Sequence, residues 1–485
     1  MPKVNTNRVS ESTEAARVRP KRVLADRYRC PEEFDELLAT AALSGESGYF
    51  RFGPNAICYG QCSSGTPAQL VTDPLHDARP QVTSNGTGVL LPFDPAQVIH
   101  NLCWERYATK AAGVQRSILK RKPIRAMYYA VRPLLPVSVR KHMQKAYLGG
   151  WEKIAFPRWP LDTGVDELIE QLLALAMKSR KLTRLPFIWF WPDGAQCCTI
   201  MTHDVETAEG VSFCPRLMDL NDSFGIKSSF QVIPEERYPV DPAFLQGIRS
   251  RGFEINVHDL NHDGHLFSDP DEFGRRAERI NSYGRAFGAI GFRSAVLYRN
   301  PDMLAALDFS YDMSFPNVAH LDPQRGGCCT VFPYFIRDIL ELPLTATQDY
   351  PLFNILKDFS IRLWQQQIGL IRKKNGLISF IVHPDYIIDE TARRVYADLL
   401  RYLAEMRDRQ ETWIALPAQV ADWWRMRSAM QLVREGSGWR IDGKGAERAR
   451  LAYAVLEGDS LSYQVDSAAS AFHQCSGGAS TERTV

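Results

Sequence analysis

Two histidines at the end of an apolar run have a spacing that can serve a metal ion. His258 and His262 lie four residues apart, directly after the apolar run 252–257. In a helical turn, imidazoles at that spacing share one face and can bind one cation, and Gly264 lets the chain leave the turn without a Cβ clash. The same spacing also occurs on surface helices that hold no ion, so the pair alone leaves both interpretations open.

Titratable side chains also follow three other apolar runs. Asp204 and Glu206 follow the first of them, Arg293 ends the second, and His383 follows the third. Titratable groups at the ends of four separate apolar runs are much harder to explain by chance than such a group at any one of them. The pattern therefore indicates a catalytic centre.

Short apolar runs alternate with longer amphipathic stretches from about residue 196 onward, which is the pattern of a (β/α) barrel. The expected strands are 197–202, 228–233, 253–257, 291–293, 339–342, 377–382 and 413–415, and the expected helices include 271–287, 353–374 and 391–407. In such barrels the chemistry gathers at the carboxyl ends of different strands. We therefore expect the titratable groups to meet at one mouth of the barrel.

Taken in order, these motifs resemble those of the polysaccharide deacetylase family, the carbohydrate esterases that share the chitooligosaccharide-deacetylase homology domain. The motifs are Thr202-His-Asp204-Val-Glu206, His258-x-x-x-His262, Gly291-Phe-Arg293 and Phe380-Ile-Val-His383-Pro, and the resemblance covers about residues 187–425. It implies a distorted (β/α) barrel of about seven strands, with a divalent metal, usually zinc, held by an acidic side chain and two histidines. Family members remove N- or O-acetyl groups from amino-sugar polymers.

Position by position, the resemblance implies a role for each motif. Asp204 matches the general base, and His258 and His262 match the metal ligands. Arg293 matches the residue that holds the base, and His383 matches the general acid.

The first motif departs from the family's commonest form. The family places a second Asp directly after the base, whereas this chain has Val205 there and Glu206 next. Strand residues two apart point the same way, so Glu206 lies on the side of Asp204 and is expected to replace the missing ligand. Asp204 itself stays open as the alternative ligand.

Two further features bear on the site. Arg293 is followed by neither the proline nor the aromatic residue of the family's third motif, so the substrate groove is expected to differ in shape. His203 and His265 have no assigned role, and we expect them to be hydrogen-bonding neighbours of the site rather than ligands.

The chemistry of these groups is that of hydrolysis. A metal held by two imidazoles and one carboxylate lowers the pKa of a water and polarises a carbonyl. A second carboxylate takes the proton of that water, and Arg293 keeps this carboxylate ionised. His383 is suited to protonate the leaving amine or alcohol, with Asp385 or another nearby carboxylate as the group that raises the pKa of His383.

The chain divides into several predicted regions. They are a disordered start at 1–30, an N-terminal accessory region at 31–185 that begins with a small β-rich part and carries a basic segment at 106–151, the barrel at 186–425, a short β-containing appendage at 426–470 and a disordered tail at 471–485.

Composition limits the partners. The net charge of +2 on 485 residues gives no overall argument for nucleic acid. Residues 1–29 lack a secretory apolar run, and no apolar segment reaches spanning length, so a soluble, cytoplasmic protein is expected. The 10 cysteines do not look like a disulfide framework, and we expect buried thiols, with Cys58 and Cys62 structural.

The basic segment is the one strong local charge. Ten Lys and Arg residues lie between Lys110 and Lys145 with no acidic residue among them. Such a field is typical of a solvated face neutralised by acidic neighbours, and it also suits peripheral attachment to an anionic membrane surface at the inner face of the membrane.

The sequence therefore predicts a metal-dependent deacetylase, with zinc as the expected metal. It would act on the amide bond of an N-acetylated amino sugar, in a glycan or a lipid-linked glycan precursor. Two alternatives remain. A small-amide hydrolase of the same architecture would have a deep, closed pocket, and a catalytically silent sugar-binding module would bind carbohydrate without metal.

Overall fold

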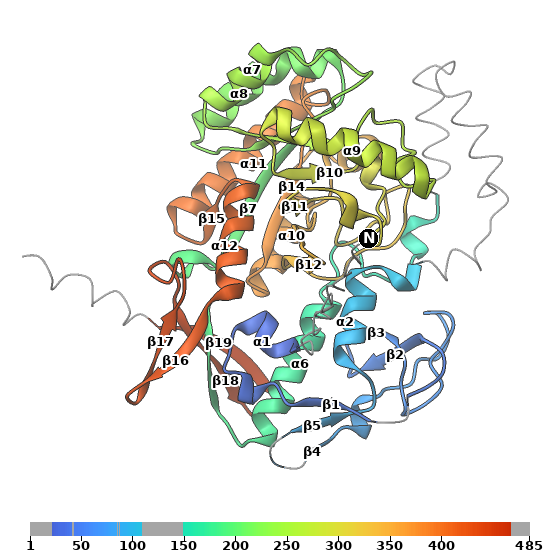
Figure 1. Cartoon of the computed structure of the whole chain (residues 1–485), viewed down its shortest axis with the longest axis vertical. Helices are drawn as coiled ribbons and strands as arrows, with labels where there is room; N and C mark the ends of the chain where they lie inside the picture. Colours follow the sequence, from blue (N-terminus) through green and yellow to red (C-terminus); the bar gives the residue numbers. More distant parts are fainter. Residues whose placement is uncertain (1–21, 41–42, 85, 87, 109–148, 467–485) are drawn as a thin grey trace, which may run out of the picture.

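The computed structural model describes residues 22–40, 43–84, 86, 88–108 and 149–466 (Figure 1). Its main sheet has nine strands in the order β12-β13-β11-β10-β9-β8-β7-β14, with β15 also paired to β7. Every pairing in this sheet is parallel except β12 with β13. The strands are β7 (Cys197–Val205), β8 (Ser229–Val232), β9 (Glu254–His258), β10 (Gly291–Arg293), β11 (Tyr311–Asp312), β12 (Tyr334–Ile336), β13 (Ile339–Glu341), β14 (Leu377–Ile381) and β15 (Thr412–Ile414).

This curled sheet with its outer helices is the predicted distorted (β/α) barrel. All seven expected strands are present, and β11 and β12 are additional. All nine residues of β7 are buried, as expected for a strand covered on both faces. Parallel pairing places the carboxyl ends of β7, β9, β10 and β14 at the same edge.

Helices cover the outside of the sheet (Figure 1). They are α7 (Ala208–Ser223), α8 (Pro242–Ser250), α9 (Pro270–Phe287), α10 (Arg362–Lys373), α11 (Glu390–Asp408) and α12 (Pro417–Ala429), with short turns η6 (Pro192–Gly194), η7 (Ala295–Leu297), η8 (Leu304–Ala306) and η9 (Pro351–Leu356). Side-chain caps begin several of them: Asp269 accepts from a backbone amide at the start of α9, and Asp389 does so at α11. None of the helices in the described part of the chain is long and apolar enough to cross a membrane.

One expected helix, 353–374, is divided in the structure. The π-helical turn η9 ends at Leu356; the next residue, Lys357, has a left-handed backbone with φ of 58°, and α10 begins only at Arg362. A left-handed residue cannot continue a right-handed helix, so the apolar periodicity alone overestimated its length.

Within the described residues from 22 to 179, two small sheets and three α-helices precede the barrel. The elements of this accessory region are α1 (Val23–Tyr28), η1 (Glu32–Phe34), β1 (Leu37–Ala39), β2 (Gly48–Phe52), β3 (Ala56–Gly60), η2 (Arg79–Gln81), β4 (Thr83–Ser84), β5 (Val89–Leu91), α2 (Pro95–Cys103), η5 (Trp151–Lys153) and α6 (Gly164–Ser179). The predicted disorder of residues 1–30 is wrong for α1, in which Leu24 and Tyr28 are buried. Arg27 fixes this helix by an ion pair of 2.9 Å with Asp166, a tertiary contact that the local sequence does not reveal.

Strands that follow the barrel in the sequence pair with a strand that precedes it. The hairpin of β16 (Gln431–Glu435) and β17 (Gly438–Asp442) is followed by β18 (Leu451–Glu457) and β19 (Ser460–Val465). Strand β18 pairs with β6 (Arg184–Ile188), so this β-containing segment completes a sheet that begins before the barrel.

The accessory region packs against the loops that follow β10 and β11. Arg299 Nε donates to Glu105 Oε1 at 2.7 Å, and both side chains are buried. The Tyr107 hydroxyl donates to the carbonyl of Gly327 at 2.6 Å, and the Asp162 amide donates to Asn317 at 2.8 Å. These buried polar contacts hold the accessory region and the barrel loops in one packed body.

Candidate active site

The barrel brings the predicted site residues together at the carboxyl ends of four strands. Asp204 lies near the end of β7, and Glu206 follows that strand. His258 ends β9, and Arg293 ends β10. His383 comes two residues after β14, which pairs directly with β7.

Glu206, His258 and His262 form a compact group whose ligand atoms all lie within 4.8 Å of one another. His262 Nε2 lies 2.9 Å from Glu206 Oε1, and His258 Nε2 lies 3.8 Å from the same oxygen. His258 Nδ1 is 3.1 Å from the carbonyl of Arg293. Because a carbonyl can only accept, Nδ1 is the donor, and Nε2 is the ring nitrogen that faces Glu206 and is left for a metal ion.

This group fits a divalent metal. The Nε2 atoms of His258 and His262 are buried and make no hydrogen bond of good geometry within the described residues, although both lie close to Glu206. Buried nitrogens without a hydrogen-bond partner are costly unless something else satisfies them. Two imidazoles and one carboxylate are a donor set typical of catalytic zinc, and they leave coordination positions open.

The backbone that delivers His262 differs from the expected helical turn. His258 is still part of strand β9, and the chain then turns through left-handed conformations at Asp259 and His262, each with φ of 57°. Gly264 is left-handed as well, with φ of 77°, so its lack of a Cβ serves the exit from the loop. The prediction of one helical turn is therefore wrong, although the loop does bring the two imidazoles together.

Asp204 lies beside this group and is held by Arg293. Arg293 donates to Asp204 Oδ1 at 2.6 Å, to the Thr202 hydroxyl at 2.8 Å and to the carbonyl of Met313 at 3.0 Å. The other carboxylate oxygen lies 3.7 Å from His258 Nε2. Burial acts to raise the pKa of Asp204, but Arg293 and the neighbouring histidines outweigh it and hold that pKa below its ordinary value.

His383 approaches the group from the side of β14. Its Nδ1 lies 2.7 Å from Asp349 Oδ1, and its backbone amide donates to Asp349 Oδ2 at 2.7 Å. Its Nε2 faces Glu206 at 3.6 Å. Burial acts to lower the pKa of His383, but the carboxylates of Asp349 and Glu206 outweigh it and raise that pKa well above its ordinary value.

Asp349 is the residue that the sequence analysis missed. The named candidate, Asp385, makes no hydrogen bond to His383 among the described contacts, whereas Asp349 is completely buried against the imidazole. Asp349 lies in the loop after β13, several residues beyond the end of that strand. The sequence signal for Asp349 is that this carboxylate follows the apolar run 339–342, another expected strand of the barrel.

The remaining candidates have structural contacts. His203 is buried; its Nδ1 lies 2.8 Å from the carbonyl of Val382, and its Nε2 accepts from Asn221 at 3.0 Å. Burial lowers the pKa of His203 to about 4, so this ring is a neutral neighbour of the site. His265 Nδ1 lies 3.4 Å from the Ser268 hydroxyl.

None of the described cysteines belongs to the ligand group of Glu206, His258 and His262. The nine described cysteines, including Cys58 and Cys62, are buried free thiols. Most of the basic segment, residues 109–148, lies outside the described residues. Arg106, at its start, forms an ion pair of 2.6 Å with Asp302.

Comparison with known proteins gives similarity to solved structures. No family model matches the chain, and no curated protein sequence matches it. A putative polysaccharide deacetylase from Mycobacterium smegmatis is 21% identical with a TM-score of 0.41, over 49% of this chain and 93% of the other. A Puue allantoinase is 14% identical with a TM-score of 0.37, over 48% and 92%. A probable polysaccharide deacetylase from Pseudomonas aeruginosa PAO1 is 13% identical with a TM-score of 0.38, over 48% and 93%. Solved polysaccharide deacetylases thus match about half of this chain at low sequence identity.

Proposed function

We propose that this chain is a metal-dependent hydrolase that removes acetyl groups from N-acetylated amino sugars of a glycan or lipid-linked glycan precursor. The observation that carries the proposal is the arrangement around Glu206, His258 and His262. The Asp204 carboxylate, paired with Arg293, lies beside this donor set, and His383, paired with Asp349, faces it from another strand. A base, an acid and a ligand set around one point are the parts that amide hydrolysis needs.

The donor set has a defined task in this proposal. Glu206, His258 and His262 would hold a divalent ion, for which zinc is the best match to the donor types. When bound, such an ion lowers the pKa of a water and polarises the carbonyl of the acetamido group.

The base and the acid then act in turn. Asp204 accepts a proton from the attacking water, and Arg293 keeps this carboxylate ionised and oriented. His383 gives a proton from Nε2 to the amide nitrogen as the carbon–nitrogen bond breaks, which releases acetate and a free amine. Asp349 accepts the hydrogen bond from Nδ1 and so keeps Nε2 directed at the centre.

One observation favours a second candidate, a small-amide hydrolase. The side chains of Asp204, His258, His262 and His383 are between 1% and 6% exposed, and Glu206 is 20% exposed. A centre that is reached through so little surface suits a compact amide as well as the acetamido group of a sugar. The complete base–arginine and acid–aspartate pairs, in contrast, do not favour a catalytically silent module.

An acetate-release assay tests the proposal. The panel contains N-acetylated glycans of increasing length and small N-acetyl amides, each incubated with the purified chain before chelation, after chelation and after zinc is restored. We expect acetate from the N-acetylated glycans, loss of that activity on chelation and its return with zinc. Release from small amides alone would support the second candidate, and no release from any substrate by zinc-loaded protein would reject both.

A further inference from the structure

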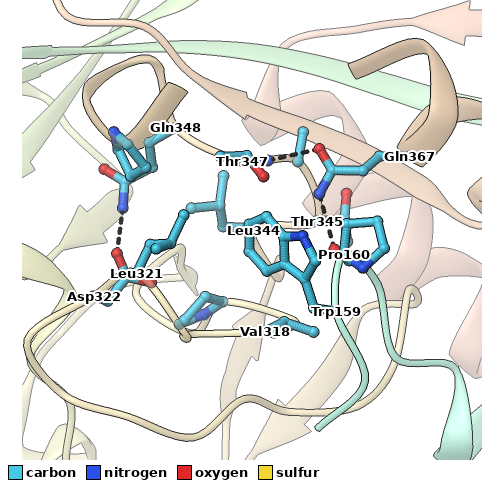
Figure 2. A pocket seen from close by; sticks show the side chains of 13 residues that line it. Trp159, Pro160, Val318, Leu321, Asp322, Leu344, Thr345, Thr347, Gln348 and Gln367 are labelled. Carbon is cyan, nitrogen blue, oxygen red and sulfur yellow. Dashed lines mark hydrogen bonds between the residues drawn. The ribbon is translucent and has the colours of Figure 1, made fainter. Parts of the chain in front are cut away.

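A small cavity lies where the accessory region meets the loops at the mouth of the barrel (Figure 2). Its volume is about 20 Å³. Trp159 and Pro160 come from the accessory region, Leu321 and Asp322 from the loop after β11, and Thr347 and Gln348 from the loop after β13. Three segments distant in the sequence therefore line one small, partly open cavity.

The cavity shares a loop with Asp349, the residue that holds His383. Gln348 lines the cavity, and the next residue, Asp349, holds both the ring and the backbone amide of His383. Leu344, another residue of the lining, packs with Ile381, two residues before His383. A group bound in the cavity would thus sit against the segment that positions the proton donor.

The cavity combines apolar walls with one unpaired hydroxyl. The backbone of Thr347 is fully used, since its amide donates to Gln367 at 3.0 Å and its carbonyl accepts from Trp364 at 2.7 Å. Its hydroxyl is buried and has no hydrogen-bond partner within the described residues, and Thr347 is only 9% exposed. A buried hydroxyl without a partner is unfavourable by about 1–3 kcal/mol, so this atom is suited to a ligand or a water.

The other walls define what fits beside that hydroxyl. Figure 2 shows the Trp159 indole standing between Leu344 and Pro160, with the Gln348–Asp322 pair on one side of it. Gln348 Nε2 donates to Asp322 Oδ1 at 2.9 Å, which leaves polar oxygens at that edge. Trp159 is itself fixed by stacking on His320, with the ring centroids 5.9 Å apart.

The size of the cavity excludes a whole sugar ring. A volume of about 20 Å³ accommodates one or two water-sized groups. A methylene carbon that carries a hydroxyl matches both the apolar walls and the Thr347 hydroxyl. We propose that this cavity is a subsite for the exocyclic hydroxymethyl group of the amino sugar, with Thr347 as its hydrogen-bond partner and Trp159 as its apolar wall. This inference rests on the proposed function, because it takes the sugar as the substrate.

Binding without turnover tests the subsite separately from catalysis. The probes are the N-acetylglucosamine tetramer and its 6-deoxy analogue, titrated calorimetrically into zinc-loaded Asp204→Asn protein. We expect the 6-deoxy tetramer to bind about tenfold more weakly, which is the loss of one buried hydrogen bond. Adding Thr347→Val should weaken binding of the normal tetramer about tenfold and abolish the difference between the two sugars.

Two further variants control this experiment. Thr347→Ser keeps the hydroxyl and should keep the preference, whereas Thr183→Val, at an exposed threonine before β6, should change nothing. Equal binding of both sugars by the Asp204→Asn protein that retains Thr347 would show that the cavity holds only water and would overturn the proposal. Failure of both tetramers to bind would also overturn it, while acetate release from another N-acetylated glycan would leave the proposed function standing.

Discussion

Asp204→Asn is expected to lower kcat for acetate release by about 10³-fold, within the range measured for loss of a general base, while the protein keeps its metal. Asparagine has the same shape as aspartate but cannot take a proton from water. The ligand group of Glu206, His258 and His262 is untouched by this change, so metal content should stay at the wild-type value. Steady-state kinetics and elemental analysis of the same preparation give both quantities.

Glu206→Gln is the matched comparison, because it also replaces a carboxylate by its amide two residues away. This variant should lose metal or bind it weakly, since Glu206 lies 2.9 Å from His262 Nε2 and within the donor set. Glu447→Gln, at an exposed carboxylate of the carboxyl-terminal segment, should alter neither quantity. If Asp204→Asn lost metal while Glu206→Gln kept it, the two carboxylates would have exchanged roles.

His383→Ala is expected to lower kcat on an N-acetylated glycan by about 10³-fold, because an amine leaves an amide only when its nitrogen is protonated. The same variant should hydrolyse 4-nitrophenyl acetate with a far smaller loss, since nitrophenolate leaves without a proton. Asp349→Asn should act in the same direction with a smaller effect, because it disturbs the His383 ring without removing it. The ratio of the two kcat values, measured on one preparation, isolates the proton donor.

A uniform loss on both substrates would contradict this role for His383. Such a result would mean that the histidine supports the structure or the metal site and does not donate the proton. Metal analysis of the same variant separates these two causes.

The barrel and most of its centre could be predicted because parallel strands impose strong constraints. Buried strands such as β7 appear as apolar runs, and their carboxyl ends must lie at one edge, so polar residues after several runs must meet. Glu206 lies 3.8 Å from His258 Nε2, on the side of the strand that its spacing from Asp204 predicts. Strand periodicity fixes which side chains share a face.

The rest depends on contacts that local sequence does not encode. Strand β11 has only two residues, Tyr311 and Asp312, and gives no apolar run to detect. Asp349 reaches His383 from a loop, and the loop conformation at His262 depends on left-handed residues that periodicity does not reveal. Helix α1 is held by tertiary partners, among them Asp166, rather than by its own composition.

The most direct test of the account is the metal content of the purified chain, measured by elemental analysis in the wild type and in the double variant His258→Ala, His262→Ala. His265→Ala is the matched control, because it removes a nearby imidazole that lies outside the ligand group. We expect about one divalent ion per chain in the wild type and in His265→Ala, and loss of that ion in the double variant while circular dichroism shows a folded protein. Undiminished zinc in the folded double variant would contradict this expectation.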